Sequence, residues 1–274
     1  MEASQVLARR RGRIATALRA GFARVLDIAL PQLCATCREP VHGAGLCAAC
    51  WSKLSFIAPP YCERLGIPFP FDGGPGLLSM EAIADPPAYH RARAAVRYDD
   101  ISSKLVHALK YDRRRAVAPI LAALMAGAGA DLLADADAVV PVPRHPWRAI
   151  HRGFNQADEL SRRLGRPVWR VLSRVRAGPP QSTLPAEARR HIAGSFVVRT
   201  RQLWPTAAAA HSVTGCVIVL IDDVMTTGAT LNACSEALLK AGAAQVRALT
   251  AARVVAARRK PPRPSPLLVT RSRQ

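Results

Sequence analysis

A chain of 274 residues, half of them hydrophobic, can form one sizeable domain with attachments or two modest domains. No apolar run reaches about 18 residues and arginines interrupt every apolar stretch near the N-terminus, so we expect no membrane span, no secretory signal and a cytoplasmic location. The 39 Lys and Arg outnumber the 19 Asp and Glu, which gives a net charge of +20 and fits either a polyanionic partner such as nucleic acid or solvated basic ends.

The N-terminal quarter contains two different segments. Residues 1–30 are predicted to form a basic amphipathic helix or extension, whereas residues 31–88 are rich in cysteine, glycine and proline. In the second segment, two Cys-x-x-Cys pairs lie nine residues apart, a distance at which four thiolates can enclose a tetrahedral Zn²⁺. The pattern predicts a structural zinc site made by Cys34, Cys37, Cys47 and Cys50. A redox function, a chance spacing and His42 as a substitute ligand are the alternatives.

From residue 89 to residue 255, apolar strand segments alternate with helical segments. The predicted strands are residues 92–98, 138–143, 167–172, 195–198, 216–221 and 245–255. The predicted helices are residues 101–111, 116–130, 155–165 and 229–241, with Asn155 as a cap and with Gly165 and Gly242 as stops. This alternation predicts a mostly parallel sheet with helices on both faces. Residues 256–274 are basic, rich in proline and predicted to be disordered.

Two adjacent carboxylates, Asp222 and Asp223, follow the strand predicted at residues 216–221. The carboxyl end of a parallel strand is where such sheets bind ligands. Two ionised neighbours repel each other, so the pair fits a site where ribose hydroxyls, a metal ion or both face it. The next residues, Met225 to Thr230, form a turn of small residues before a helix, where backbone amides favour a phosphate. A simple helix cap is the alternative, and the missing Walker spacing argues against a nucleoside triphosphatase.

The run "VLIDDVMTTGAT", Val219 to Thr230, resembles the signature of type I phosphoribosyltransferases. The resemblance implies an α/β domain with a parallel sheet flanked by helices, and a donor substrate, 5-phosphoribosyl 1-pyrophosphate. It also implies that Asp222 and Asp223 are catalytic and hold the ribose hydroxyls, while Mg²⁺ bridges the pyrophosphate and these hydroxyls. The residues implied for the phosphate loop are Val224, Met225, Thr226, Thr227, Gly228, Ala229 and Thr230.

Other segments resemble the ComF family, and the resemblance covers about residues 28–255. The run "PVPRHPWRAIHRGFNQA" is similar to a family segment placed like a pyrophosphate loop, which implies that Arg144, Arg148 and Arg152 bind pyrophosphate, with a solvated loop as the alternative. Residues 105–114 and 179–196 also resemble the family; we expect the latter to be a mobile loop and His107 in the former to be packed in the core. Many relatives carry a second cysteine quartet, of which only Cys62 remains here, so we expect a metal-free remnant in which Leu65, Ser79 and Ala82 replace the missing cysteines.

Two functions of different class follow from these features. The favoured one is a Mg²⁺-dependent phosphoribosyltransferase, with an acceptor that the resemblance does not specify and a link to DNA uptake in competence. The alternative is a non-catalytic accessory protein that associates with DNA, such as single-stranded DNA, and with the competence machinery, using the fold as a sensor or scaffold.

Overall fold

The computed structural model describes residues 32–41, 45–111, 117–144, 155–175, 195–198 and 211–255. Several predictions lie outside these ranges: the N-terminal extension, residues 179–194 of the predicted loop, the C-terminal tail, Arg148 and Arg152.

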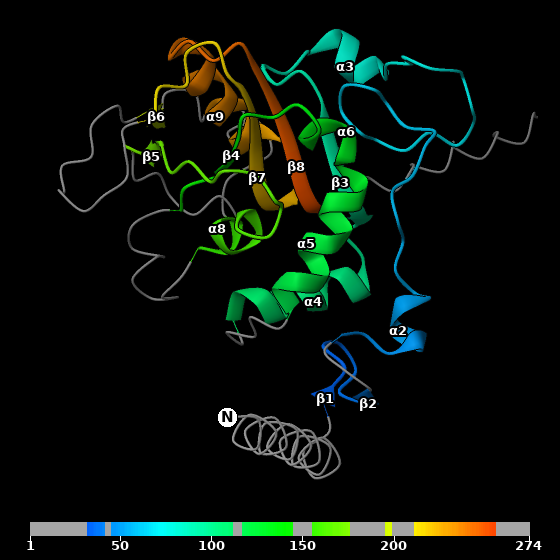
Figure 1. Cartoon of the computed structure of the whole chain (residues 1–274). Helices are drawn as coiled ribbons and strands as arrows, with labels where there is room; N and C mark the ends of the chain where they lie inside the picture. The colour runs from blue at the N-terminus through cyan, green and yellow to red at the C-terminus, as the bar shows by residue number, and fades with distance from the viewer. Residues whose placement is uncertain are drawn as a thin grey trace, which may run out of the picture.

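A four-stranded parallel sheet forms the centre of the protein, with strand order β3-β8-β7-β4 (Figure 1). These strands are β3 (Ala92–Arg97), β4 (Ala138–Pro141), β7 (Val217–Met225) and β8 (Gln245–Arg253). In the register, Ile218 lies beside Ala138 on one side and Val246 on the other. The parallel sheet predicted from the alternating pattern is therefore confirmed.

Helices cover both faces of this sheet, as predicted. On one face, Val219 and Ile221 pack into a core with residues from α4, α5, α6 and α8. On the other face, Ile218 and Leu220 pack with residues from α9. The helices are α4 (Asp100–Tyr111), α5 (Val117–Ala128), α6 (Ala130–Leu133), α8 (Gln156–Ser161) and α9 (Ala229–Lys240). This burial on both faces explains why the strands are nearly continuous apolar runs.

Small elements surround this core. The antiparallel pair of β5 (Leu172–Arg174) and β6 (Phe196–Val198) lies next to α9. The antiparallel pair of β1 (Gln32–Leu33) and β2 (Pro40–Val41) and the short helix α2 (Ala48–Trp51) lie beyond α4, whereas α3 (Met80–Ala84) lies at the opposite end of the molecule (Figure 1). We call residues 32–54 the first ribbon and residues 61–85 the second ribbon.

Three strand and helix predictions were wrong in part. Strand β7 continues through both aspartates to Met225 because it pairs with β8 along its whole length. Helix α8 begins at the predicted cap, Asn155, but ends at Ser161, and tighter turns with i→i+3 hydrogen bonds lead to Gly165, whose φ is 70°. In the strand predicted at residues 167–172, only Val168 forms an isolated bridge before β5 begins.

His107 of α4 lies on the surface of the protein. The expectation that His107 is packed in the core was wrong, because its side chain is exposed while its neighbours Val106 and Ala108 are buried. None of the helices in the described ranges is both long enough and apolar enough to cross a bilayer.

Candidate functional site

The carboxylate of Asp223 lies in a buried position between two cations. Its Oδ2 atom is 2.9 Å from Nζ of Lys110, in the last turn of α4, and 3.7 Å from Nη2 of Arg144, just after β4. The Asp223 side chain is only 9% exposed, so its charge depends on these partners rather than on water. The structure thus brings Asp223 and Arg144 together, as expected for one site.

Lys110 is a member of this site that sequence reasoning missed. It follows the buried residues Val106 and Leu109 on α4, at a position four residues after Val106 that faces the same side of the helix. The signal that could have identified Lys110 is its position on the same side of the helix as buried apolar residues, where a lysine is unusual.

The Asp222 side chain lies on the other face of β7, because adjacent residues of a strand point to opposite faces. Its Oδ1 atom accepts a hydrogen bond from the backbone N–H of Asp223 at 2.8 Å, and its charge acts on Cys234 of α9. Burial, followed by the charge of Asp223, raises the pKa of Asp222 to about 7. Any ligand that contacts both carboxylates must therefore reach them at the carboxyl end of the strand.

The turn between β7 and α9 exposes donors suitable for an anion. Thr226 and Thr227 are exposed, and within the described ranges the N–H groups of Thr226, Thr227 and Gly228 donate to no protein acceptor. Gly228 has a φ of 80°, and a Cβ at this position would lie 2.8 Å from Cε of Met225. Only glycine fits this conformation and this contact without strain. The turn therefore presents free amides at the N-terminus of a 12-residue helix.

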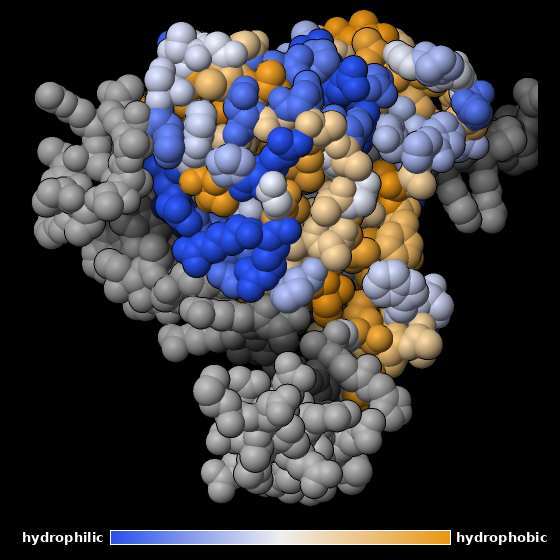
Figure 2. Space-filling model, viewed as in Figure 1, coloured by the Kyte–Doolittle hydropathy of each residue, from blue (hydrophilic) through white to orange (hydrophobic). Residues whose placement is uncertain are grey.

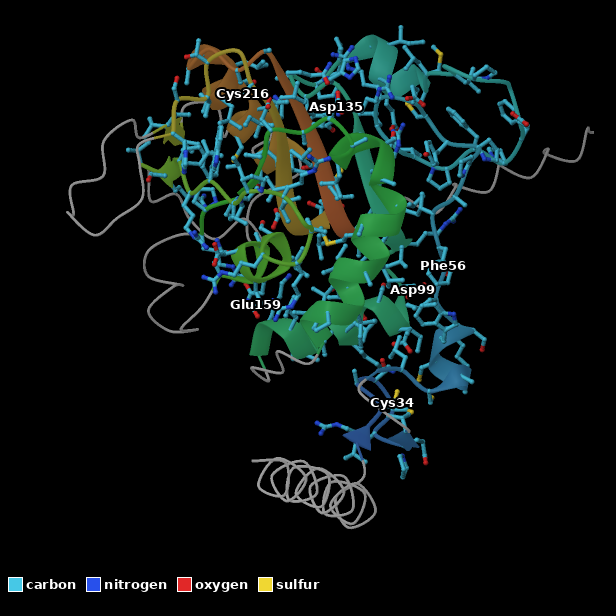
Figure 3. All side chains as sticks on the ribbon, in the orientation of Figure 1. Cys34, Phe56, Asp99, Asp135, Glu159 and Cys216 are labelled. Atoms are coloured by element: carbon cyan, nitrogen blue, oxygen red, sulfur yellow. The ribbon has the colours of Figure 1, made fainter. Side chains whose placement is uncertain are left out.

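The four cysteines of the first ribbon form the predicted cluster. Their Sγ atoms all lie within 4.8 Å of one another, and those of Cys37 and Cys47 are 3.6 Å apart (Figure 3 labels Cys34). Sulfurs around a tetrahedral Zn²⁺, each about 2.3 Å from the metal, lie roughly 3.8 Å apart, so the cluster fits zinc. All four are free thiols, which excludes a disulfide between them.

The surroundings of these thiols shift their pKa values in opposite directions. Although burial opposes ionisation, backbone amides lower the pKa of Cys34 to about 6. Burial and the neighbouring sulfurs raise that of Cys50 to about 12. Four thiolates this close repel one another unless a metal ion balances their charge, as Zn²⁺ does in a structural site.

The second ribbon has the backbone hydrogen bonds of the first but only one cysteine, Cys62. Four hydrogen bonds of 2.7–3.3 Å recur at equivalent positions. In the first ribbon they join Cys34 N to Glu39 O, Arg38 N to Cys34 O, Ala35 N to Gly45 O, and Cys47 N to Cys34 Sγ. In the second they join Cys62 N to Ile67 O, Gly66 N to Cys62 O, Glu63 N to Leu77 O, and Ser79 N to Cys62 Sγ.

In the second ribbon, apolar side chains stand at two of the ligand positions. Leu65 and Ala82 occupy two of the vacated ligand positions and are buried together with Cys62 in the core on the α9 face of the sheet. The hydroxyl of Ser79, at the third position, accepts a hydrogen bond from Ala82 N at 3.3 Å and caps α3. In the described ranges, the cysteines of the first ribbon are the only cluster of three or more potential metal ligands.

We therefore expect the purified protein to contain one zinc ion per chain. Cys37→Ser removes one of the four ligands and is expected to abolish stoichiometric zinc. Cys62→Ser is the matched control and is expected to retain one zinc, because Cys62 belongs to the metal-free ribbon. Atomic emission measurements on the three proteins check this, and two zinc ions in the unmodified chain, or a loss in Cys62→Ser, would contradict it.

Comparison with protein families defines the class of the protein. Residues 25–81 match the family described as "Double zinc ribbon domain", and residues 116–268 match the one described as "Phosphoribosyl transferase domain". The chain is therefore a zinc-ribbon protein with a phosphoribosyltransferase domain.

Curated relatives narrow this class. "DNA utilization protein YhgH" of Salmonella typhi is 32% identical over 233 residues, which are 80% of this chain and 96% of the relative. "Competence protein F" of Haemophilus influenzae is 27% identical and covers 78% of this chain and 93% of its own length. "Competence protein ComFC" of Bacillus subtilis is 34% identical over 41% of this chain and 42% of its own length. The chain belongs to the ComF family, as its motifs predicted.

Solved structures give a weaker similarity. Orotate phosphoribosyltransferase from Aeropyrum pernix is 19% identical and covers 58% of this chain and 80% of its own length, with a TM-score of 0.28.

Proposed function

We propose that the protein binds 5-phosphoribosyl 1-pyrophosphate and transfers its phosphoribosyl group to an acceptor in a Mg²⁺-dependent reaction. The observation that carries this proposal is the arrangement at the end of β7, where two carboxylates are followed directly by a turn with free amides. A sugar that bears both hydroxyls and a terminal phosphate matches such a site. A phosphoribosyltransferase domain in the same part of the chain supports this choice of sugar phosphate.

Each part of the donor has a counterpart in the chain. The 5′-phosphate would accept hydrogen bonds from the amides of residues 226–228 and from threonine hydroxyls of the turn, helped by the dipole of α9. The ribose 2′ and 3′ hydroxyls would donate to Asp222 and Asp223. The pyrophosphate would lie near Arg144 and Lys110, because these are the cations beside Asp223.

Magnesium fits this site as a companion of the donor rather than as a resident ion. Apart from the cysteine quartet, the described residues contain no group of three or more side chains able to hold a metal. Mg²⁺ often binds through substrate phosphates and one or two carboxylates, which this site can supply. When bound, it would neutralise charge on the departing pyrophosphate.

The reaction would break the bond between C1 of the ribose and the pyrophosphate oxygen, and the bonding electrons would leave with the pyrophosphate. The acceptor would form the new bond to C1 and lose a proton to solvent or to the pyrophosphate. The carboxylates of Asp222 and Asp223 would favour positive charge developing on the ribose ring, and Lys110 and Arg144 would favour the negative charge of the leaving group.

Calorimetric titration with the donor tests this function. We expect saturable binding that is stronger with Mg²⁺ than with EDTA, since the ion offsets repulsion between the pyrophosphate and the aspartates. Asp135→Asn is a suitable control, because Asp135 is a surface carboxylate paired with Arg247 at the opposite end of the strands. Absence of binding in a folded, zinc-loaded protein would refute the proposal, and release of pyrophosphate in a screen of bases, nucleosides and DNA would identify the acceptor.

Association with DNA is a second candidate function. Figure 2 shows a strongly hydrophilic area on the face that carries α8. After this helix, Arg162 and Arg170 are about half exposed and share the carboxylate of Asp158. The names of the relatives refer to DNA utilization and competence. Each phosphate contact on double-stranded DNA contributes about −0.9 to the slope of log affinity against log salt. A salt titration on single- and double-stranded DNA tests this function, and flat, weak binding would dismiss it.

A further inference from the structure

The two ribbons contact different parts of the phosphoribosyltransferase domain. The first ribbon packs through Ala35 and Leu46 against the core on the α4 face of the sheet. The second ribbon packs through Leu65 into the core on the α9 face, which also contains Met225 at the start of the turn. The ribbon without a metal is therefore the one that lies next to the turn with free amides.

Arg253 connects the second ribbon to this turn. It is the last residue of β8, and its side chain is buried, with 6% of its surface exposed. Its Nη1 atom donates to the carbonyl oxygen of Leu65 and to Sδ of Met225, each at 2.7 Å. These two acceptors hold the Nη1 end of the buried guanidinium, whereas its Nε atom has no hydrogen-bond partner among the described residues. The ribbon and the first residue of the turn are thereby held by one side chain.

Tyr89 is a second buried residue that lies next to the turn, near Gly228. Its side chain is 2% exposed, and a Cβ on Gly228 would lie 3.2 Å from its hydroxyl oxygen. Burial raises the pKa of Tyr89 to about 12 and the nearby charge of Arg253 opposes this rise, so the phenol is neutral and lies beside the guanidinium. The turn thus rests on Met225 and Tyr89, and Arg253 contacts both of these residues.

The second ribbon is itself firmly attached to the sheet. Ala92 N, at the start of β3, donates to Arg64 O at 2.8 Å. Gly66 has a φ of 65°, and a Cβ at this position would lie 2.4 Å from Ala92 O, a contact that only glycine permits. The carbonyl group of Leu65, which accepts from Arg253, lies between these two attachments. Its position is therefore set by the backbone rather than by a metal.

We propose that Arg253 is a positioning residue for the phosphate turn, and that the metal-free second ribbon is the fixed support to which Arg253 ties Met225. The identity of the turn's ligand rests on the proposed function, but the tie itself does not. The first ribbon and its zinc have no part in holding the turn.

Hydrogen exchange in the ligand-free protein, followed by mass spectrometry, tests this tie directly. Arg253→Met replaces the side chain with an unbranched apolar one and removes the guanidinium N–H donors. The amides of Asn232 and Val254 donate to the turn at Gly228 O and Met225 O. They are expected to exchange about tenfold faster or more, because local opening no longer breaks the two hydrogen bonds of Arg253, while α4 and α5 keep their rates. Arg253→Lys retains a charge and a donor, and an intermediate rate is expected.

Two further variants each change one of the two ribbons. Gly66→Ala forces the second ribbon away from Ala92 O and is expected to speed exchange at the amides of Asn232 and Val254, even though the substitution lies in another segment. Cys37→Ser disturbs only the zinc-binding ribbon and is expected to leave exchange at those residues as in the unmodified chain.

Binding of the pyrophosphate donor to the same variants adds a second readout. In Arg253→Met we expect weaker donor binding, partly restored in Arg253→Lys. Unchanged exchange at Asn232 and Val254 in both Arg253→Met and Gly66→Ala overturns the proposal, as does a uniform rise across the whole sheet or an equal rise in Cys37→Ser. If the unmodified protein binds no donor, the proposed function fails, whereas the exchange rates still decide whether Arg253 holds the turn.

Discussion

Asp223→Asn is expected to weaken binding of the phosphoribosyl pyrophosphate donor about 10- to 100-fold, the loss typical of removing a charged hydrogen-bond acceptor. The same change is expected to destabilise the protein by about 1–3 kcal/mol, because Lys110 and Arg144 would lose the carboxylate between them. Both cations keep some contact with water, which places the cost below that of a fully buried ion pair. Calorimetry and urea denaturation measure the two effects.

Lys110→Met provides the complementary variant for this prediction. Among the described residues it leaves Asp223 with Arg144, at 3.7 Å, as its cationic partner, and it is expected to lower stability as well. If the two substitutions act through the same ion pair, their combined cost is smaller than the sum of the single costs. Strict additivity, or donor binding by Asp223→Asn equal to that of the unmodified protein, would contradict the assignment.

The parts of the fold that local pattern determines could be predicted from the sequence. The apolar run before Asp222 and the small residues up to Thr230 are contiguous, so strand, turn and helix could be read together. The spacing of the four cysteines in the first ribbon likewise specified its zinc site. The continuation of β7 to Met225 could not be predicted, because carboxylates are unfavourable in strands and only the pairing with β8 keeps them extended.

Contacts between distant segments account for what the sequence did not reveal. Arg253 and Leu65 are 188 residues apart, and the partner of this arginine is a backbone carbonyl, which leaves no trace in side-chain identity. The second ribbon was expected as a metal-free remnant on account of its single cysteine. Its preserved hydrogen bonds start from backbone N–H groups, which the sequence does not reveal, and any apolar core could contain Leu65 and Ala82. Lys110 looked like an ordinary helical lysine until the fold placed it beside Asp223.

Removing the charge of Asp222 should stabilise the protein, whereas removing that of Asp223 should destabilise it. Burial and the charge of Asp223 raise the pKa of Asp222 from 3.8 to about 7 on folding. Between these two values the folded protein binds more protons at this site than the unfolded chain, so the contribution of Asp222 to the free energy of unfolding falls as pH rises from about 4 to about 7. Above this range the folded state retains a carboxylate that is poorly solvated and repelled by its neighbour.

Asp222→Asn is therefore expected to stabilise the protein at pH 8 while weakening donor binding about 10- to 100-fold. Asparagine keeps an oxygen that can accept from the N–H of Asp223, and it removes the charge. One pKa unit corresponds to about 1.4 kcal/mol, and because Asp222 is partly exposed we expect a gain on the order of 1–2 kcal/mol, well below the full shift.

The pH dependence separates this explanation from a general effect of losing one negative charge. The stability difference between Asp222→Asn and the unmodified protein is expected to be small at pH 4, to grow up to about pH 7 and then to level off. Urea denaturation at five or six pH values measures it, and Asp135→Asn, where pairing with Arg247 lowers the pKa of Asp135 to about 2, should show no such gain. A stabilising effect that is equal at all pH values, or a loss of stability at pH 8, would show that Asp222 is well solvated or paired in the folded protein. The two adjacent aspartates would then not differ as proposed, with the charge of Asp223 stabilised by cations and the charge of Asp222 destabilising the folded state.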